Sequence, residues 1–173
     1  MTTLAPAPDA PVLDAPVLDA REFRNACGGF STGVTVISTR CGEGDHAMTA
    51  NAFMSISLDP PLIAISLADT ARMLPRLRAA GAFAVSVLRE GMEDIAWHFA
   101  GKPRIEGAAP FSELGGLPVI DEAATVFVAD VHSEMTAGDH VIVVGHVHSM
   151  RSDPQARPLL FHGGRFACLP EVA

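Results

Sequence analysis

A run of small hydroxyl and amide side chains in the first third of the chain is the clearest candidate for ligand binding. Thr49, Asn51, Ser55 and Ser57 alternate with apolar residues, and nothing between positions 48 and 58 is charged. Alternation with a period of two predicts a β-strand with one polar face. A solvated face normally carries Lys, Glu or Arg, so these donors suit a flat, hydrogen-bonding ligand. The alternative is a half-buried face whose hydroxyls bond neighbouring backbone.

The seven histidines are the other residues that could do chemistry. His146 and His148 lie two apart in a β-branched run and would share one face of a strand. No third ligand follows at a suitable spacing, so the sequence predicts no metal site. His140 stands in Gly138-Asp139-His140 at the start of a predicted strand. This places its imidazole at a barrel mouth beside Asp139, either as a functional group or as a structural histidine.

Two glycine patterns imitate known motifs. Residues 29–33 fit G-x-S-x-G around Ser31, but that nucleophile turn needs a strand before the serine and a helix after it. The order predicted here is helix, Ser31, strand, and Asp139 with His140 would point in divergent directions as its partners. Residues 42–47 fit the dinucleotide pattern G-x-G-x-x-A, yet a strand follows and two acidic residues would repel phosphate. We interpret this second pattern as a hairpin turn.

The elements that must position these residues are mostly strands. We predict a short helix over 21–27, strands over 30–39, 48–58 and 62–67, a helix before Gly81, a strand over 82–88, a helix over 92–100, a loop over 101–118, and strands over 124–131 and 139–148 with a turn at 134–138. Because proline cannot donate to a ladder, Pro60 and Pro61 are expected to break the pairing between the strands on either side. Thr70 and Arg72 lie just outside the second helix, where helix N-termini bind phosphate.

Composition limits the class of protein. A chain of 173 residues with 49% hydrophobic and 18% charged residues predicts one globular domain. The net charge of −8 argues against a nucleic-acid surface. No apolar run approaches the roughly 18–20 residues of a membrane helix, and the N-terminus lacks a secretory pattern. Three scattered cysteines predict a reduced, cytoplasmic setting. The repeated DAPVL of residues 1–20 predicts a flexible tail before a domain over 21–173.

The run MTANAFMSISLDPPL, residues 48–62, resembles the signature of the short-chain flavin reductases, the small components of two-component flavin-dependent monooxygenases. Residues 30–36 are similar to the Phe-x-Thr-Gly-Val-Thr-Val of that family, residues 138–140 to its Gly-Asp-His, and residues 158–166 to its closing strand. The resemblance covers about residues 21–169. It implies an FMN-binding split barrel, mainly β with short helices and of Greek-key type, in a homodimer with the flavin near the interface.

The function implied by this resemblance is that of an NAD(P)H:flavin oxidoreductase. It would reduce FMN or FAD with NADH or NADPH and supply the reduced flavin to a separate oxygenase. His140 would take the family's role in nicotinamide binding and hydride transfer. The family usually has Ser or Thr at the position of Met73, which leaves open how many side chains hold the phosphate. The implied flavin contacts are Thr32, Gly33, Thr49, Ala50, Asn51, Ser55, Ile56, Thr70 and Arg72. A non-catalytic flavin-binding protein and a hydrolase at Ser31 are the alternatives.

Overall fold

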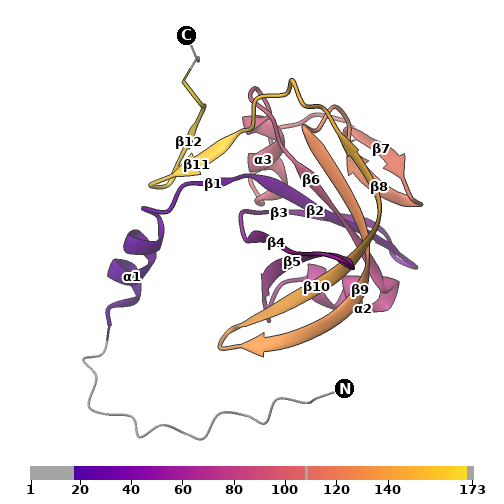
Figure 1. Cartoon of the computed structure of the whole chain (residues 1–173). Helices are drawn as coiled ribbons and strands as arrows, with labels where there is room; N and C mark the ends of the chain where they lie inside the picture. The colour runs from indigo at the N-terminus through magenta and orange to yellow at the C-terminus, as the bar shows by residue number, and fades with distance from the viewer. Residues whose placement is uncertain (1–17, 108, 171–173) are drawn as a thin grey trace, which may run out of the picture.

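The computed structural model describes residues 18–107 and 109–170, and most of the described chain is β-strand (Figure 1). The duplicated segment at the N-terminus lies outside the described residues. The elements of the described part are α1 (Ala20–Cys27), β1 (Thr32–Gly33), β2 (Thr35–Cys41), β3 (Gly44–Ala50), β4 (Phe53–Leu58), β5 (Pro61–Ala68), α2 (Met73–Ala80), β6 (Ala82–Val87), α3 (Glu93–Phe99), β7 (Phe111–Leu114), β8 (Leu117–Ile120), β9 (Thr125–Ala137), β10 (His140–Ser152), β11 (Leu160–His162) and β12 (Arg165–Ala167).

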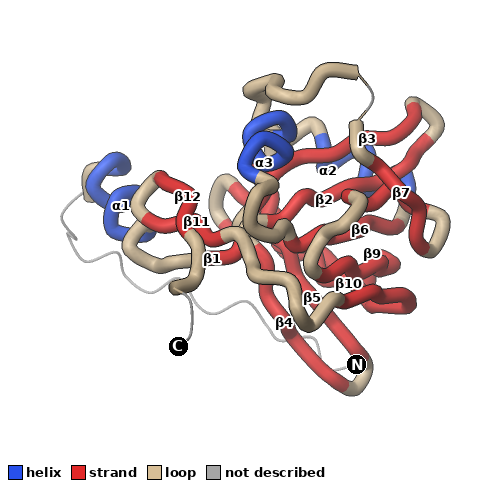
Figure 2. Tube along the Cα trace, turned by 90° about the horizontal axis from the view of Figure 1, so that it is seen from above, coloured by secondary structure: helices blue, strands red, loops and turns tan. Residues whose placement is uncertain are grey.

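Seven of the described strands form one antiparallel sheet in the order β3-β2-β6-β9-β10-β5-β4. Strands β3 and β4 follow each other in the chain but occupy opposite edges of this sheet. Only Asn51 and Ala52 join them, and three Cα–Cα steps span at most about 11 Å. The sheet is therefore curled so that β3 and β4 approach each other at this crossover (Figure 1). The view from above shows α1, β1, β11 and β12 together at one side of the large sheet (Figure 2). Because β3 and β4 are joined by chain rather than by a ladder, the result is a barrel split along one seam.

Two apolar cores lie on opposite faces of the curled sheet, because successive residues of a strand point to opposite sides. Val36 and Ala84 face the core beneath α3, β7 and β8, whereas Ile37 and Phe83 face the core that α2 covers with Leu77. At Gly145 of β10 a Cβ would stand 2.6 Å from the Phe83 ring and 2.8 Å from the Ala129 Cβ. Gly145 therefore lets the Phe83 ring pack against the β10 backbone.

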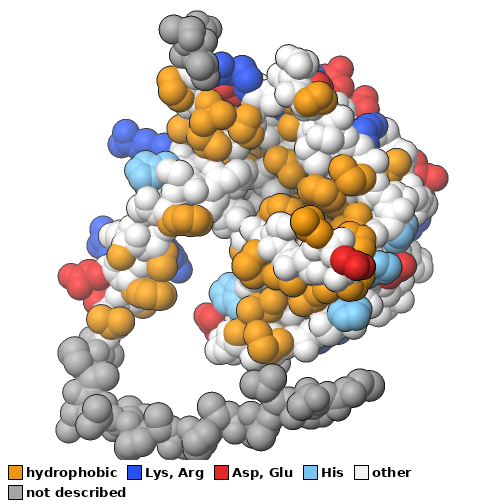
Figure 3. All heavy atoms as spheres, viewed as in Figure 1, with side chains coloured by type: hydrophobic (Ala, Val, Ile, Leu, Met, Phe, Trp, Pro, Cys, Tyr) orange, Lys and Arg blue, Asp and Glu red, His pale blue; other side chains and the backbone are white. Residues whose placement is uncertain are grey.

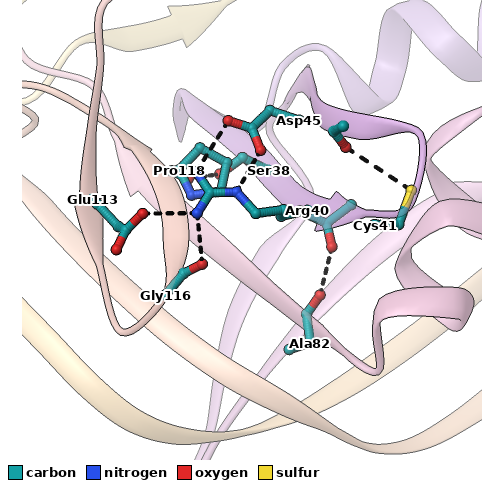
Figure 4. Close-up of polar contacts among 10 residues, drawn as sticks. Ser38, Arg40, Cys41, Asp45, Ala82, Glu113, Gly116 and Pro118 are labelled. Carbon is teal, nitrogen blue, oxygen red and sulfur yellow. Dashed lines mark hydrogen bonds and ion pairs between the residues drawn. The ribbon is translucent and has the colours of Figure 1, made fainter.

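The hairpin β7–β8 is fastened to β2 and β3 by polar contacts (Figure 4). Arg40 donates to Asp45 and to Glu113, each at 2.7 Å, and to the carbonyl oxygen of Gly116 at 3.2 Å. The buried hydroxyl of Ser38 donates to the Pro118 carbonyl oxygen. The hydrogen bond from Arg40 holds the pKa of the Asp45 carboxyl below its usual value. These contacts fix the β7–β8 hairpin, where the segment that follows α3 ends.

An arm made of α1 and the small sheet β1-β11-β12 extends from one side of the barrel (Figure 1). Asp19 caps α1 by accepting from the backbone N–H groups of Arg21 and Glu22, each at 2.9 Å. None of the residues of α1, all of which are described, is buried. Phe23 and Phe30 are 59% and 77% exposed. The arm thus has an apolar side that its own chain does not cover.

The structure confirms the predicted helices and corrects the prediction for the two prolines. Gly81 ends α2 in the left-handed conformation, with φ 69°. Strands β4 and β5, however, pair with each other directly, with Leu58 opposite Pro61. The predicted break in pairing was wrong because a proline in a turn or at the first residue of a strand removes no ladder hydrogen bond.

Three further boundaries differ from the prediction. The segment 101–118 is not all loop, because β7 and half of β8 lie in it. Residues 134–137 belong to β9, so only Gly138 and Asp139 turn the chain into β10. The strand predicted over 30–39 is divided at Val34 into β1 and β2, which belong to different sheets. Strand pairing set each boundary: β7 pairs with β8 and β9 with β10 across two-residue turns, whereas β1 pairs with the distant β11. No helix within the described ranges is long and apolar enough to cross a membrane.

Candidate functional site

Three cavities follow one another beside the seam of the barrel, and we name them by their linings. The hydroxyl cavity, of about 320 Å³, is lined by residues that include Ser31, Thr32, Thr35 and Asn51. The aromatic cavity, of about 170 Å³, shares Asn51 with it. The cationic cavity, of about 370 Å³, shares Ala100 with the aromatic cavity. The shared wall residues, Asn51 and Ala100, place the three cavities in a row.

The hydroxyl cavity lies between β1, the start of β2 and the crossover from β3 to β4. The Thr32 hydroxyl is buried and has no hydrogen-bond partner among the described residues. The neighbouring Thr35 hydroxyl, in contrast, donates to the Ala50 carbonyl oxygen at 2.6 Å. Leaving a buried polar group unpaired costs about 1–3 kcal/mol, so a ligand that bonds Thr32 recovers free energy. Because this oxygen is covered in the structure, the Thr32 side chain must rotate towards the cavity to bond the polar edge of a heterocycle.

The aromatic cavity is closed by side chains from α3 and the arm. The Trp97 and Phe166 rings meet edge to face at 5.2 Å between centroids, and Phe161 and Phe166 do so at 5.6 Å. Lys102 Nζ lies 4.1 Å from the centroid of the Trp97 ring. Ring faces and edges of this kind pack against flat apolar ligands. The cavity suits a ring system, with its only polar wall on the β3 side.

Thr49 shows how that polar wall is fixed. Its hydroxyl donates to the Ala96 carbonyl oxygen at 2.7 Å and so ties β3 to α3. A hydroxyl has one proton to donate, so Thr49 can only accept from a ligand. The side chain expected to donate to the flavin is therefore used to position the wall, and donors on this side of the cavity must come from Asn51 or from backbone N–H groups.

The cationic cavity lies where β3, α2 and α3 converge. Its polar side chains are those of His46, Arg72 and His98. Arg72 is the first residue before α2 and forms no ion pair with the residues that the structure describes. Burial, and to a lesser extent the nearby Arg76 and Arg72 guanidinium groups, lowers the pKa of His46 below its usual value. The positive field at the N-terminus of α2 adds to that of the arginines.

The structure brings most of the predicted flavin residues together. Thr32 and Gly33 line the hydroxyl cavity, Thr49 and Ala50 the aromatic cavity, and Arg72 the cationic cavity. Asn51 borders two of the three. The prediction that Thr49, Asn51, Ser55 and Ser57 share one strand face was wrong, because the chain leaves β3 at Asn51 and enters β4 at the opposite edge of the sheet.

Three predicted residues lie outside these cavities. Ser55 and Ile56 are exposed on β4, at a bulge where the pairing with β5 shifts by one residue. Thr70 lies in the turn that precedes α2, two residues before Arg72. A bulge rotates the side chains that follow it, which is why alternation alone misassigned this strand. Their role in binding stays a prediction.

His140 also lies outside the three cavities, at the first residue of β10 and opposite Ala68 of β5. Its Nδ1 is 2.8 Å from Asp139 Oδ1, and this contact holds the pKa of the Asp139 carboxyl below its usual value. Along β10, His140 and Ile142 share a face, and Ile142 lines a shallow pocket of about 150 Å³ with Ala52 and Ser66. Ala52 belongs to the same crossover as Asn51, so His140 approaches the seam from the other side.

Sequence reasoning missed His46, His98 and the two phenylalanines of the arm. The single tryptophan was a recognisable candidate for stacking, but its partners, Phe161 and Phe166, are more than sixty positions away in the chain. His46 stood in a segment interpreted only as a hairpin. That hairpin is confirmed, since β2 and β3 pair from Thr35 to Cys41, but its position against α2 and α3 cannot be read from local sequence.

The hydrolase alternative and a metal site were also compared with the structure. Ser31 follows α1 and precedes β1, which confirms the predicted order and excludes the nucleophile turn. Its hydroxyl lies 2.9 Å from His162 Nδ1, not near Asp139 or His140. His162 makes no contact with a carboxylate within the described ranges. The same ranges contain no group of three or more His, Cys, Asp or Glu residues placed to hold a metal ion.

The split barrel and the three adjoining cavities beside its seam, which we call the groove, define a small β-barrel protein with a candidate ligand-binding site. Comparison with known families makes the assignment specific, because the model described as "Flavin reductase like domain" matches residues 27–170. The chain belongs to the flavin reductase family, as the resemblance implied.

Individual relatives agree with this assignment. The "4-hydroxyphenylacetate 3-monooxygenase, reductase component" of Thermus thermophilus is 44% identical over 139 residues, which cover 80% of this chain and 89% of that protein. The "NADH-dependent flavin reductase" of a Rhodococcus species is 37% identical and covers 84% of each chain. Among solved structures, the flavin reductase PheA2 in its native state superposes with a TM-score of 0.85 at 40% identity, covering 89% of this chain and 100% of that one. The split-barrel fold is thereby confirmed.

Proposed function

We propose that this protein is an NADH-dependent flavin reductase that reduces FMN or FAD and releases reduced flavin to a separate oxygenase. Family membership supports the reaction, and relatives named as reductase components of monooxygenases support the oxygenase partner. The observation that carries the proposal is the groove. An aromatic cavity lies between two others: one has a hydroxyl without a hydrogen-bond partner, and one has a guanidinium without an ion pair, both judged among the described residues.

In this proposal the flavin lies along the groove, with its ring system in the hydroxyl and aromatic cavities and its phosphate in the cationic cavity. Thr32 and Asn51 would bond the polar edge of the isoalloxazine, and Trp97 would pack against the ring system. The ribityl chain would then run past Ala100, which lines both the aromatic and the cationic cavity, towards Arg72. Arg72 would bind the phosphate through charge-assisted hydrogen bonds, which are the strongest a protein offers to a phosphate.

The chain itself supplies orientation rather than acid–base groups. When bound, the flavin supplies the hydride acceptor, and donor and acceptor must meet within about 3–3.5 Å. His140 is the residue that we assign to the nicotinamide. Asp139 accepts from its Nδ1, which leaves Nε2 free, and its imidazole is partly exposed on the face of β10 next to the seam. The rates of oxidation of NADH and NADPH are compared in the same assay.

A homodimer is part of the proposal, and the exposed apolar surface supports it. Leu58, Met54 and Ile56 of the edge strand β4 are 92%, 53% and 44% exposed. With the uncovered side of α1, they form hydrophobic surface of the kind that marks protein interfaces. Figure 3 shows such side chains in a band across the barrel and along the arm. A second copy would cover the edge of β4 and the arm, both of which lie close to the seam.

The test is NADH oxidation by the purified full chain, first without flavin and then with FMN or FAD. Oxidation that depends on added flavin, with NADH preferred over NADPH, is the expected result. Oxidation by a yellow protein without added flavin would show that the flavin is a tightly bound cofactor. Flavin binding with no oxidation of either nicotinamide would refute the proposed reaction and leave a flavin-binding protein. Light scattering of the same sample tests the homodimer.

A further inference from the structure

Three polar side chains, and not Arg72 alone, line the cationic cavity. His46 contributes from β3, Arg72 from the residue before α2, and His98 from α3. None of the residues that line this cavity has a carboxylate. The volume of about 370 Å³ corresponds to roughly a dozen water molecules, which accommodates a pyrophosphate as well as a single phosphate. The lining as a whole therefore favours an anion.

His98 is held in one tautomer by the backbone. Its Nδ1 lies 3.3 Å from the Arg104 backbone nitrogen and 3.2 Å from that of Ile105, and both of these N–H groups donate to it. A nitrogen that accepts two N–H groups cannot carry a proton itself, so the proton of the neutral ring is on Nε2. His98 therefore presents Nε2–H as a donor, and the segment after α3 sets its orientation.

His46 is placed to respond to a bound anion. The charged groups that face it are Arg72 and Arg76, both from α2, and Arg76 pairs with Glu43 at 2.8 Å. From α3, His98 lines the same cavity. On the adjoining strand, Arg40 is already paired with Asp45. Two guanidinium groups oppose a third positive charge, and they are also the groups whose charge a phosphate offsets.

We propose that His46 takes up a proton from solvent when the phosphate or pyrophosphate of a flavin binds beside Arg72, and that His98 donates to the same group through Nε2. The inference rests on the proposed function, because it assumes that the isoalloxazine lies in the two neighbouring cavities. Its consequence is a preference for FMN and FAD over riboflavin that becomes stronger as the pH falls.

The first experiment measures the affinity of the full chain for riboflavin, FMN and FAD by flavin fluorescence. Arg72→Gln should weaken FMN and FAD binding about ten- to a hundredfold, the range for hydrogen bonds to charged groups, and riboflavin binding less than about twofold. His98→Asn keeps an acceptor near the position of Nδ1 and removes the Nε2 donor, so about tenfold weaker FMN binding is expected. The control is Arg78→Gln, on the same helix, whose guanidinium binds Glu134 at 2.7 Å. It should leave all three affinities unchanged.

The second experiment varies the pH. FAD is the ligand, because its pyrophosphate keeps its charge where the FMN phosphate titrates, near about pH 6. One proton taken up changes affinity by at most tenfold per pH unit, so the wild-type chain should bind FAD about three- to tenfold more tightly at about pH 6 than at about pH 8. His46→Gln cannot take up this proton, and its affinity should be independent of pH over this range. A wild-type affinity that does not change with pH would overturn the role of His46.

Two further results separate this inference from the proposed function. Equal affinities for riboflavin and FMN, with NADH still oxidised, would overturn the inference alone. The predicted pattern of affinities without NADH oxidation would overturn the proposed reaction alone. The pyrophosphate of the nicotinamide nucleotide has the same chemistry, so NAD⁺ binding is measured in parallel. If Arg72→Gln weakened NAD⁺ binding and left FMN binding intact, the assignment of this cavity to the flavin would be wrong.

Discussion

Replacing Thr32 by Val should make the protein more stable and a poorer flavin binder. The Thr32 hydroxyl is buried without a partner among the described residues, and valine has the same shape without the polar group. Burial of an unpaired hydroxyl costs about 1–3 kcal/mol, and we expect the lower end because the residue as a whole is only partly buried. Thr32→Val should therefore raise the free energy of unfolding of the flavin-free protein by about 1 kcal/mol, or the Tm by about 2–4 °C.

The same substitution removes the group that we assign to the isoalloxazine edge. A neutral hydrogen bond contributes about 0.5–1.5 kcal/mol, which predicts FMN and riboflavin affinities that are both about two- to tenfold weaker. Thermal unfolding without flavin and fluorescence titration with each flavin measure the two effects separately. The matched control is Thr35→Val. Its buried hydroxyl donates to the Ala50 carbonyl oxygen at 2.6 Å, so its loss should lower stability by about 1 kcal/mol.

The two valine substitutions should therefore change the free energy of unfolding in opposite directions. A Thr32→Val variant that is less stable than the parent would mean that the hydroxyl has a partner in the folded protein, such as an ordered water. Unchanged flavin affinities would remove Thr32 from the binding site. Thr32→Ser keeps the hydroxyl and should retain most of the affinity, which separates loss of the polar group from loss of packing.

Three further predictions concern other parts of the molecule. His140→Ala should slow NADH oxidation at least about tenfold and change FMN affinity less than about twofold, and equal turnover in a stopped-flow assay would exclude its role at the nicotinamide. Gly145→Ala should lower the unfolding free energy by about 1–3 kcal/mol, because its Cβ would stand 2.6 Å from Phe83, and Phe83→Leu in the same chain should restore part of the loss in denaturant unfolding. Asp45→Asn should cost at most about 1 kcal/mol at neutral pH, because the pair with Arg40 is partly exposed. Because that pair lowers the pKa of Asp45, its contribution to stability is present above the pKa of the unfolded state and is lost as the pH falls through the lower pKa of the folded state. The variant and the parent should therefore become equally stable in strong acid. Thermal unfolding at several pH values measures this.

The helix boundaries and the family could be predicted from the sequence alone. Gly81 ends α2 because a left-handed residue is needed there, and this requirement is local. The run from Met48 to Leu62 identified the flavin reductase family, and the match over residues 27–170 confirms it. Local patterns succeed where the physical cause acts within a few residues of the chain.

The geometry of the groove depends on contacts that no local pattern contains. Thr49 and Ser55 were expected on one strand, but the chain crosses the seam between them, because pairing along the whole sheet places β3 and β4 at opposite edges. The donor of Thr49 is used by a carbonyl oxygen on α3, forty-seven positions away. Sequence determined which side chains are available for chemistry. Only the curling of the sheet decided which of them share a cavity, because burial and strand pairing are properties of the whole fold.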